Sequence, residues 1–278
     1  MTGLFDSHTH INIDGIDEEE RAEIIAAIEK SDVAAVVDVG FDVKSSAEAA
    51  ARAARLPWCF ASVGIHPHDA ETADRDAYEQ ITRLSKLPGV VAIGEIGLDF
   101  YRDLSPRDVQ RDAFKRQIAI ALEERMPIII HDRDSDGESV SILISEGAFS
   151  GERKSQFDAN PVSGTADARV LLHCYSGTLD QALEYIAMGA SISIAGPVTY
   201  KNNEELHEVA RGVPLEHMMI ETDAPYLAPV PYRGKRNISP YIEYTAAAVA
   251  DLRGITYEQL VTATFANAER FFGVTVGK

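Results

Sequence analysis

The sequence predicts an α/β protein that folds as a single (β/α)₈ barrel of the TIM type over residues 1–278. Eight short apolar runs rich in β-branched residues alternate with amphipathic segments of helical spacing. The runs are apolar on both faces, which is typical of a parallel sheet that is covered on both sides. Eight such strand–helix units in about 250 residues match the repeat and the length of this barrel.

The expected strands follow one another along the whole chain. They occupy residues 4–11, 33–40, 58–66, 89–99, 126–134, 169–177, 190–198 and 217–225. Helical patterns lie between them at residues 17–32, 44–56, 75–87, 105–126, 178–190 and 202–213, and a last helix at 256–272 closes the chain. An open doubly wound sheet is the alternative, but "DSHTHIN" stands where its glycine-rich phosphate turn would follow the first strand.

One stretch interrupts this alternation. Residues 149–168, approximately, are rich in Ser, Gly, Asp and Pro and separate the fifth unit from the sixth strand. We expect a mobile polar insertion on the surface of the single domain. Placed over the rim of the barrel, it would limit the size of the substrate and the access of a duplex.

Composition restricts the class of protein. The formal net charge of −18 argues against a protein that coats nucleic acid through a basic surface, although a small cationic pocket remains compatible with phosphodiester chemistry. No apolar run is long enough to span a membrane, and the first residues do not resemble a secretory signal. Two cysteines far apart, Cys59 and Cys174, argue against disulfides and thiolate zinc sites, so we expect a cytoplasmic protein.

Histidines and carboxylates gather at the expected strand ends. In "FDSHTHI", alternation puts Asp6, His8 and His10 on one side of the first strand. Six potential metal ligands come from five strands: His8, His10, Glu95, His131, His173 and Asp223. Because active sites of these barrels lie at the carboxyl ends of the strands, the six are expected to converge on one rim. The remaining histidines outside strand ends, His207 and His217, are expected on the surface.

Four imidazoles and two carboxylates exceed the needs of one tetrahedral ion and suit two divalent ions. Such a pair clamps an attacking and a leaving oxygen and lowers the pKa of bound water. We expect Glu95 to bridge the ions and Asp223 to accept the proton of the attacking water, which makes these two the catalytic carboxylates. Asp6, in phase with His8, is expected to orient an imidazole. The metal stays open among Zn²⁺, Mn²⁺, Ni²⁺ and Mg²⁺.

Eight blocks occur in order from residue 6 to about residue 273: "DSHTHI", "VGIHPH", "AIGEIGLDFYR", "PIIIHDRD", "LLHCYSG", "IETDAPYLAP", "YRGKRN" and "ANAERFFG". Together they resemble the TatD family of metal-dependent deoxyribonucleases, (β/α)₈ barrels of the amidohydrolase-like superfamily that hydrolyse phosphodiester bonds of DNA. The resemblance implies the same six metal ligands. Asp132 departs from the family's usual Ser, and the spacing from His131 to His173 exceeds the usual one because of the insertion.

Cationic and aromatic residues near the strand ends are candidates for the substrate. Arginine forks suit phosphate oxygens, which points to Arg102, Arg133, Arg233 and Arg236, with Lys235 beside them. His66 from the third strand is expected to hydrogen-bond a phosphate or a ligand. Tyr101 and Tyr226 could stack bases of a single strand, or merely pack on the rim.

These observations predict a two-metal deoxyribonuclease that degrades single-stranded DNA from its ends, as an exonuclease does, without sequence specificity. An amide or ester hydrolase of the same superfamily is the alternative, including one that removes misattached residues from transfer RNA. Many amidohydrolases bridge their metals with a carbamylated lysine at strand four, and "GVVAIGEIGLDF" has no lysine. A metal-binding scaffold without activity is the third possibility. A monomer is favoured, and the sequence leaves exonuclease or endonuclease action open.

Overall fold

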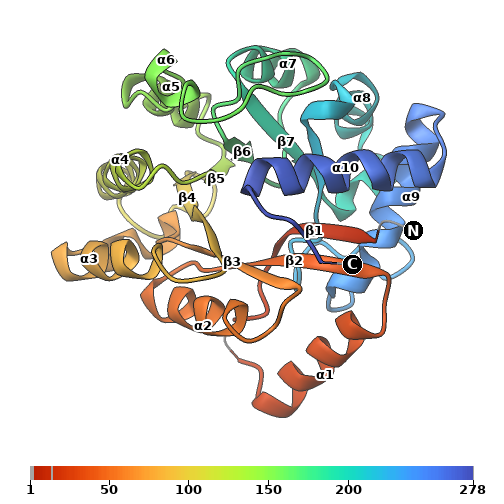
Figure 1. The fold of residues 1–278 in the computed structure, drawn as a ribbon, viewed down its shortest axis with the longest axis horizontal. Helices are drawn as coiled ribbons and strands as arrows, with labels where there is room; N and C mark the ends of the chain where they lie inside the picture. The colour runs from red at the N-terminus through yellow and green to blue at the C-terminus, as the bar shows by residue number, and fades with distance from the viewer. Residues whose placement is uncertain (1–2, 14, 278) are drawn as a thin grey trace.

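The computed structural model describes residues 3–13 and 15–277, which form an eight-stranded parallel barrel ringed by helices (Figure 1). The strands are β1 (Leu4–Thr9), β2 (Val33–Val39), β3 (Cys59–Val63), β4 (Val90–Asp99), β5 (Ile128–Arg133), β6 (Val170–Leu172), β7 (Ala190–Ile194) and β8 (Met218–Ile220). They are hydrogen-bonded in sequence order. This order confirms the predicted barrel and excludes a doubly wound sheet, whose order reverses at a switch point.

The α-helices are α1 (Glu18–Glu29), α2 (Val43–Ala53), α3 (Arg75–Leu84), α4 (Arg107–Glu123), α5 (Glu138–Ser145), α6 (Gly151–Lys154), α7 (Leu179–Ala187), α8 (Glu204–Gly212), α9 (Ile242–Arg253) and α10 (Tyr257–Phe272). Short 3₁₀ turns are η1 (Pro67–Thr72), η2 (Gly196–Thr199), η3 (Leu215–His217) and η4 (Ser239–Tyr241). Helices α5, α6 and α9 were not among the predicted ones. Within the described residues, no helix is both long and apolar enough to cross a membrane.

Alternate strand residues fill the inside of the barrel, and α10 covers its amino-terminal end (Figure 1). The ring of Phe5 from β1 lies 5.8 Å from that of Phe265 and 5.9 Å from that of Phe272, both on α10. Asn267 of α10 donates to the carbonyl groups of Leu215 and Met218 at the start of β8. The end covered by α10 is therefore a packed floor, and the opposite rim is left for the polar strand ends.

Closure of the barrel joins the first strand to the segment that follows the last. Thr9 pairs with Ala224 in a parallel bridge, and the amide of Asp223 donates to the carbonyl of His8. The carboxylate of Asp6 accepts the hydroxyl of Thr222 at 2.6 Å and its amide at 2.9 Å. Asp6 therefore fastens the closure, and the prediction that it orients an imidazole ring is wrong.

The polar insertion lies at the floor and not over the rim. Arg153 of α6 donates to the carbonyl groups of Ala168 and Met126, and Met126 directly precedes β5. The side-chain amide of Asn160 donates to the carbonyl of Glu216, which precedes β8. These contacts hold the insertion against the amino-terminal ends of two strands. It therefore cannot limit substrate access in the way the sequence suggested.

The two histidines assigned to the surface are in fact buried. His207 is 9% exposed and hydrogen-bonds the carbonyl of Val198, while His217 is 2% exposed and contacts the hydroxyl of Ser163. The prediction failed because both partners belong to segments that only the folded chain brings near these histidines.

Candidate metal centre

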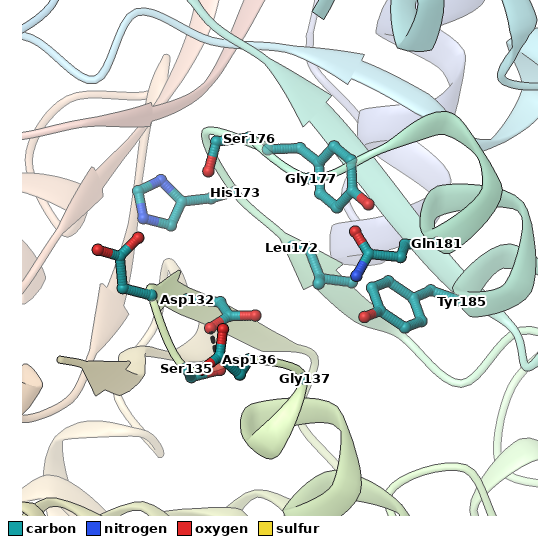
Figure 2. Close-up of a pocket in the computed structure, with 12 residues that line it drawn as sticks. Asp132, Ser135, Asp136, Gly137, Leu172, His173, Ser176, Gly177, Gln181 and Tyr185 are labelled. Carbon is teal, nitrogen blue, oxygen red and sulfur yellow. Dashed lines mark hydrogen bonds between the residues drawn. The ribbon is translucent and has the colours of Figure 1, made fainter. Parts of the chain in front are cut away.

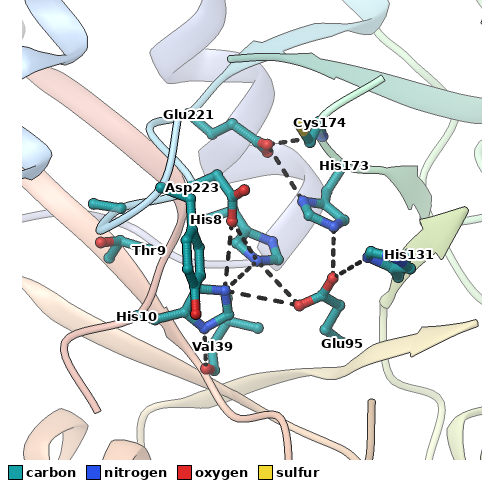
Figure 3. A network of polar contacts seen from close by, with 12 residues as sticks. His8, Thr9, His10, Val39, Glu95, His131, His173, Cys174, Glu221 and Asp223 are labelled. Atoms are coloured by element: carbon teal, nitrogen blue, oxygen red, sulfur yellow. Dashed lines mark hydrogen bonds and ion pairs between the residues drawn. The ribbon is translucent and has the colours of Figure 1, made fainter. Parts of the chain in front are cut away.

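The six predicted ligands converge at the carboxyl-terminal rim (Figure 3). His8 lies in β1, Glu95 in β4 and His131 in β5, whereas His10, His173 and Asp223 lie just beyond β1, β6 and β8. Gly97 allows β4 and β5 to approach closely here, because a Cβ at this position would collide with the carbonyl oxygen of His131. The backbone of β4 can therefore bring Glu95 against the fifth strand.

Glu95 lies at the middle of the cluster, with one oxygen toward each half. Its Oε1 is 2.7 Å from Nε2 of His173 and 2.7 Å from Nδ1 of His131. Its Oε2 is 3.5 Å from Nε2 of His8 and 3.8 Å from Nε2 of His10. A carboxylate that faces two sets of imidazoles with separate oxygens has the arrangement needed to bridge two ions.

Asp223 completes the half that contains His8 and His10. Its Oδ1 is 3.5 Å from Nε2 of His10 and 3.8 Å from Nε2 of His8, and the two imidazole nitrogens are 3.2 Å apart. Asp223 adopts a positive φ of 53°, which is uncommon outside glycine. The backbone is thus held in an unfavourable conformation at the residue that points its carboxylate into the cluster.

The outward ring nitrogens determine which nitrogens face the centre. Nδ1 of His10 contacts the carbonyl of Val39 at 2.9 Å, and a carbonyl can only accept, so this nitrogen carries the proton. Nδ1 of His173 contacts Oε1 of Glu221 at 3.3 Å. In both rings the lone pair of Nε2 is thereby directed inward, as a metal ligand requires.

His131 is oriented the other way round by Asp99. Its Nε2 lies 3.1 Å from Oδ2 of Asp99, so Nδ1 faces Glu95. The same Oδ2 contacts Nε2 of His68 at 2.8 Å, while Oδ1 accepts the amides of Tyr101 and Arg102. Burial raises the pKa of Asp99, but the hydrogen bonds from His131 and the Arg102 amide outweigh it and hold the pKa well below its usual range.

Asp99→Asn is expected to weaken metal binding about 10- to 100-fold, because an amide nitrogen would face two imidazole N–H groups and favour the wrong tautomer of His131. Titration calorimetry of the chelator-stripped protein with Mn²⁺ or Zn²⁺ measures this affinity. Asp103→Asn removes the same charge from an exposed position of the next loop and should leave the affinity unchanged. Equal affinities of Asp99→Asn and the wild type would contradict the role of Asp99.

The pKa shifts of Glu95 and His66 suit a metal centre. Burial raises the pKa of Glu95, but the imidazoles of His173 and His66 outweigh it, and the pKa stays well below its usual range. Burial holds the pKa of His66 well below its usual range. Nδ1 of His66 accepts the amide of His68, so the neutral ring presents its N–H at Nε2, 3.5 Å from Oε1 of Glu95. The predicted substrate residue His66 therefore does reach the centre.

The four predicted arginines are all exposed, and they do not enter the cluster. Arg133 lies over the ring of Tyr101, with its guanidinium carbon 4.0 Å from the ring centroid, and Arg233 lies over Tyr200 at 4.4 Å.

The other two predicted arginines lie over no ring in the described residues. Arg236 pairs with Glu20 of α1. Arg102 follows β4, and its charge lowers the pKa of Tyr226, which burial raises overall. The rim thus offers cations beside two exposed tyrosines, Tyr101 and Tyr226, with Arg236 directed to a neighbouring helix.

Two carboxylates of the site were missed in the sequence, Asp99 and Glu221. Glu221 is fully buried, and its Oε1 accepts the amide of Cys174 at 2.7 Å and contacts His173. Each missed residue follows or precedes a predicted ligand at even spacing: Asp99 comes four residues after Glu95, and Glu221 two before Asp223. Strand periodicity could therefore have indicated both.

The donors present fit divalent metal ions. Among the described residues, three groups have ligand atoms within 4.8 Å of one another: His8, His10 and Glu95; His8, His173 and Asp223; and His66, Glu95 and His131. Imidazole nitrogens with carboxylate oxygens suit Zn²⁺, Mn²⁺ and Ni²⁺. Burying so many titratable groups without a cation would be costly, which makes a metal centre the economical explanation of the cluster.

Comparisons with known proteins agree with this geometry. The model of the protein family described as "TatD related DNase" matches residues 5–273. The chain is 37% identical to the uncharacterized metal-dependent hydrolase YabD of Bacillus subtilis, over 98% of this chain and 99% of that protein. It is 34% identical to the 3'-5' ssDNA/RNA exonuclease TatD of Citrobacter rodentium, over 93% and 94%.

Solved structures extend the likeness to the fold. The TatD homologue YJJV of Escherichia coli K12 superposes with a TM-score of 0.84 at 23% identity, covering 98% of both chains. A hydrolase of the TatD family from Entamoeba histolytica gives a TM-score of 0.81 at 18% identity, covering 99% of this chain and all of that one. These two likenesses concern the barrel itself.

Proposed function

We propose that this chain, which belongs to the family of TatD-related DNases, removes nucleotides stepwise from the ends of single-stranded DNA. As a member of that family it is a metal-dependent hydrolase that acts on ester bonds. The proposed substrate follows that of a relative, the 3'-5' ssDNA/RNA exonuclease TatD of Citrobacter rodentium. The observation that carries the proposal is the placement of Glu95 between two sets of imidazoles.

In this proposal His8, His10, Glu95, His131, His173 and Asp223 hold two divalent ions. The ions would activate water near neutral pH and stabilise the charge on the leaving oxygen. Asp223, at the edge of the cluster, accepts the proton of the attacking water. His66, whose Nε2 carries a proton, donates to a phosphate oxygen, and Asp99 and Glu221 hold the rings of His131 and His173 in position.

The side chains at the rim suit the binding of single-stranded DNA. Arg102, Arg133 and Arg233 supply local positive charge on a chain whose formal net charge is −18. Tyr101 is 61% exposed and Tyr226 is 52% exposed, so both rings are available to stack on bases. Affinity is therefore expected to be salt-dependent and without sequence readout from the arginines.

Removal of the metal is expected to abolish the activity. The test is a time course on single-stranded DNA labelled at its 5′ end, with chelator-stripped protein and with protein reloaded with Mn²⁺, Mg²⁺ or Zn²⁺. Only the reloaded protein should produce a ladder that shortens from the 3′ end. DNA left intact by protein that holds two equivalents of metal, with hydrolysis of an aminoacyl-tRNA or an amide instead, would overturn the nuclease and favour the alternative hydrolase.

A further inference from the structure

A cavity opens beside the cluster of candidate metal ligands, on the other side of His173. It measures about 220 Å³ and lies between the segment that follows β5 and the segment that joins β6 to α7 (Figure 2). Leu172, Tyr175 and Tyr185 contribute apolar surface, and Asp132 and Gln181 contribute polar groups. His173 both contacts Glu95 and lines the cavity, so a molecule bound in the cavity would lie beside the candidate metal centre.

Tyr185 points to a ligand. This residue is only 8% exposed, and its hydroxyl has no hydrogen-bond partner among the residues that the structure describes. Figure 2 shows the ring of Tyr185 on the wall of the cavity, with the hydroxyl directed into it. The hydroxyl is open to the cavity, and a ligand bound there would replace water as its hydrogen-bond partner.

Two further side chains keep a free hydrogen-bonding group at the cavity. Oδ1 of Asp132 accepts the hydroxyls of Ser135 and Ser139, which leaves Oδ2 as an acceptor. The side-chain oxygen of Gln181 accepts the amide and the hydroxyl of Thr178, which leaves its amide nitrogen as a donor. The cavity thus combines a carboxylate acceptor, an amide donor and a hydroxyl that can do either.

The charge of the lining excludes phosphate. Asp132, Asp134 and Asp136 line the cavity, and none of the described residues lining it is a lysine or an arginine. An anion would be repelled, whereas a flat ring that presents N–H groups could pack against the aromatic lining. Nucleobases with an exocyclic amino group have this chemistry, since the amino group lies beside a ring nitrogen that accepts.

We propose that this cavity binds the base of the nucleotide next to the scissile phosphate and prefers cytosine, adenine and guanine to thymine. The inference rests on the proposed nuclease function and adds a specificity to it. Asp132 accepts the amino group, and Tyr185 or Gln181 donates to the ring acceptor. Thymine presents carbonyl oxygens at the same place, where they would meet the carboxylate of Asp132 and leave polar groups unpaired.

The first test compares kcat/KM of the metal-loaded enzyme on oligonucleotides that differ only in the 3′-terminal nucleotide. We expect the removal of dT to be slower than that of dC by a factor of at least about ten. Asp132→Asn keeps an oxygen for Ser135 and Ser139 and turns an amide N–H toward the cavity, so the order of dC and dT should invert. Tyr185→Phe should reduce the preference at an unchanged melting temperature, and Glu184→Gln, exposed on the same helix, should leave it as it is.

The second test measures binding of cytidine and thymidine to the metal-free wild type by NMR titration, which does not depend on catalysis. Binding of cytidine alone, lost in Asp132→Asn, supports the inference even where no oligonucleotide is cleaved. Cleavage of all four oligonucleotides at equal rates overturns it and leaves the nuclease intact. The inference is also overturned if neither nucleoside binds, or if a simple primary amine such as alanine methyl ester displaces bound cytidine.

Discussion

Glu95→Gln is expected to reduce the hydrolytic rate at least about a thousandfold, because both carboxylate oxygens of Glu95 face imidazole nitrogens and neither could be replaced by an amide nitrogen. The amide N–H₂ group would point at the nitrogens of one half of the cluster and repel a cation there. The variant should therefore bind fewer metal equivalents than the wild type. A time course on end-labelled single-stranded DNA, together with metal analysis of the same samples, measures both effects.

The control for this experiment has to separate chemistry from folding. Glu124→Gln changes the same functional group near the end of α4, where Glu124 pairs with Lys86 far from the rim, and should keep full activity. The melting temperatures of Glu95→Gln and the wild type are compared in the presence of a chelator, so that loss of metal from the variant does not affect the comparison. A Glu95→Gln protein that holds two equivalents and still degrades DNA would refute the bridging role.

Asp167→Ala is expected to lower the free energy of unfolding by about 3–5 kcal/mol, the usual cost of removing one partner of a buried ion pair. Asp167 is 1% exposed, pairs with Arg270 of α10 and accepts the amide of Arg169 at 2.8 Å. Arg153 is also buried nearby, and burial together with the charge of Arg169 lowers its pKa to about 10. Without Asp167, Arg153, Arg169 and Arg270 would lose the buried carboxylate among them, and only the exposed Asp158 would remain near Arg169.

Urea denaturation of the metal-free protein measures this loss. Asp158→Ala removes an exposed carboxylate from the same insertion and should cost less than about 1 kcal/mol. Because the floor and the rim lie at opposite ends of the barrel, folded Asp167→Ala protein should keep the wild-type affinity for metal. A loss below about 1 kcal/mol for Asp167→Ala would show that the arginines find other partners.

Much of the barrel could be predicted because each strand carries its own signal. All eight predicted runs contain an observed strand, although β6 and β8 extend only over Val170–Leu172 and Met218–Ile220. His173 and Asp223 consequently lie in the loops after their strands, and His10 directly follows the end of β1 at Thr9. The position of the insertion could not be predicted, since the contacts of Arg153 with Met126 and of Asn160 with Glu216 join distant parts of the chain.

The convergence of the six candidate ligands was predictable for a similar reason. The rule that strand ends meet at one rim needs only the order of the elements, and it brings Glu95 to His8 without knowledge of side-chain geometry. The hydrogen bonds that orient these ligands could not be predicted in the same way. Strand alternation puts Asp99 on the same side as Glu95, but it does not specify that Asp99 contacts His68 and His131, which belong to other strands and loops. The metal ligation itself stays a prediction.

Barrel closure also sets when a newly made chain can take up metal. His8 and Asp223 are separated by more than two hundred residues, so the first leaves the ribosome at least about ten seconds before the second at ~5–20 residues per second. The bridge between Thr9 and Ala224 cannot form earlier. Nascent chains therefore lack the complete site until the eighth strand has been made, and a metal ion that needs Asp223 as a ligand could be taken up only after that point.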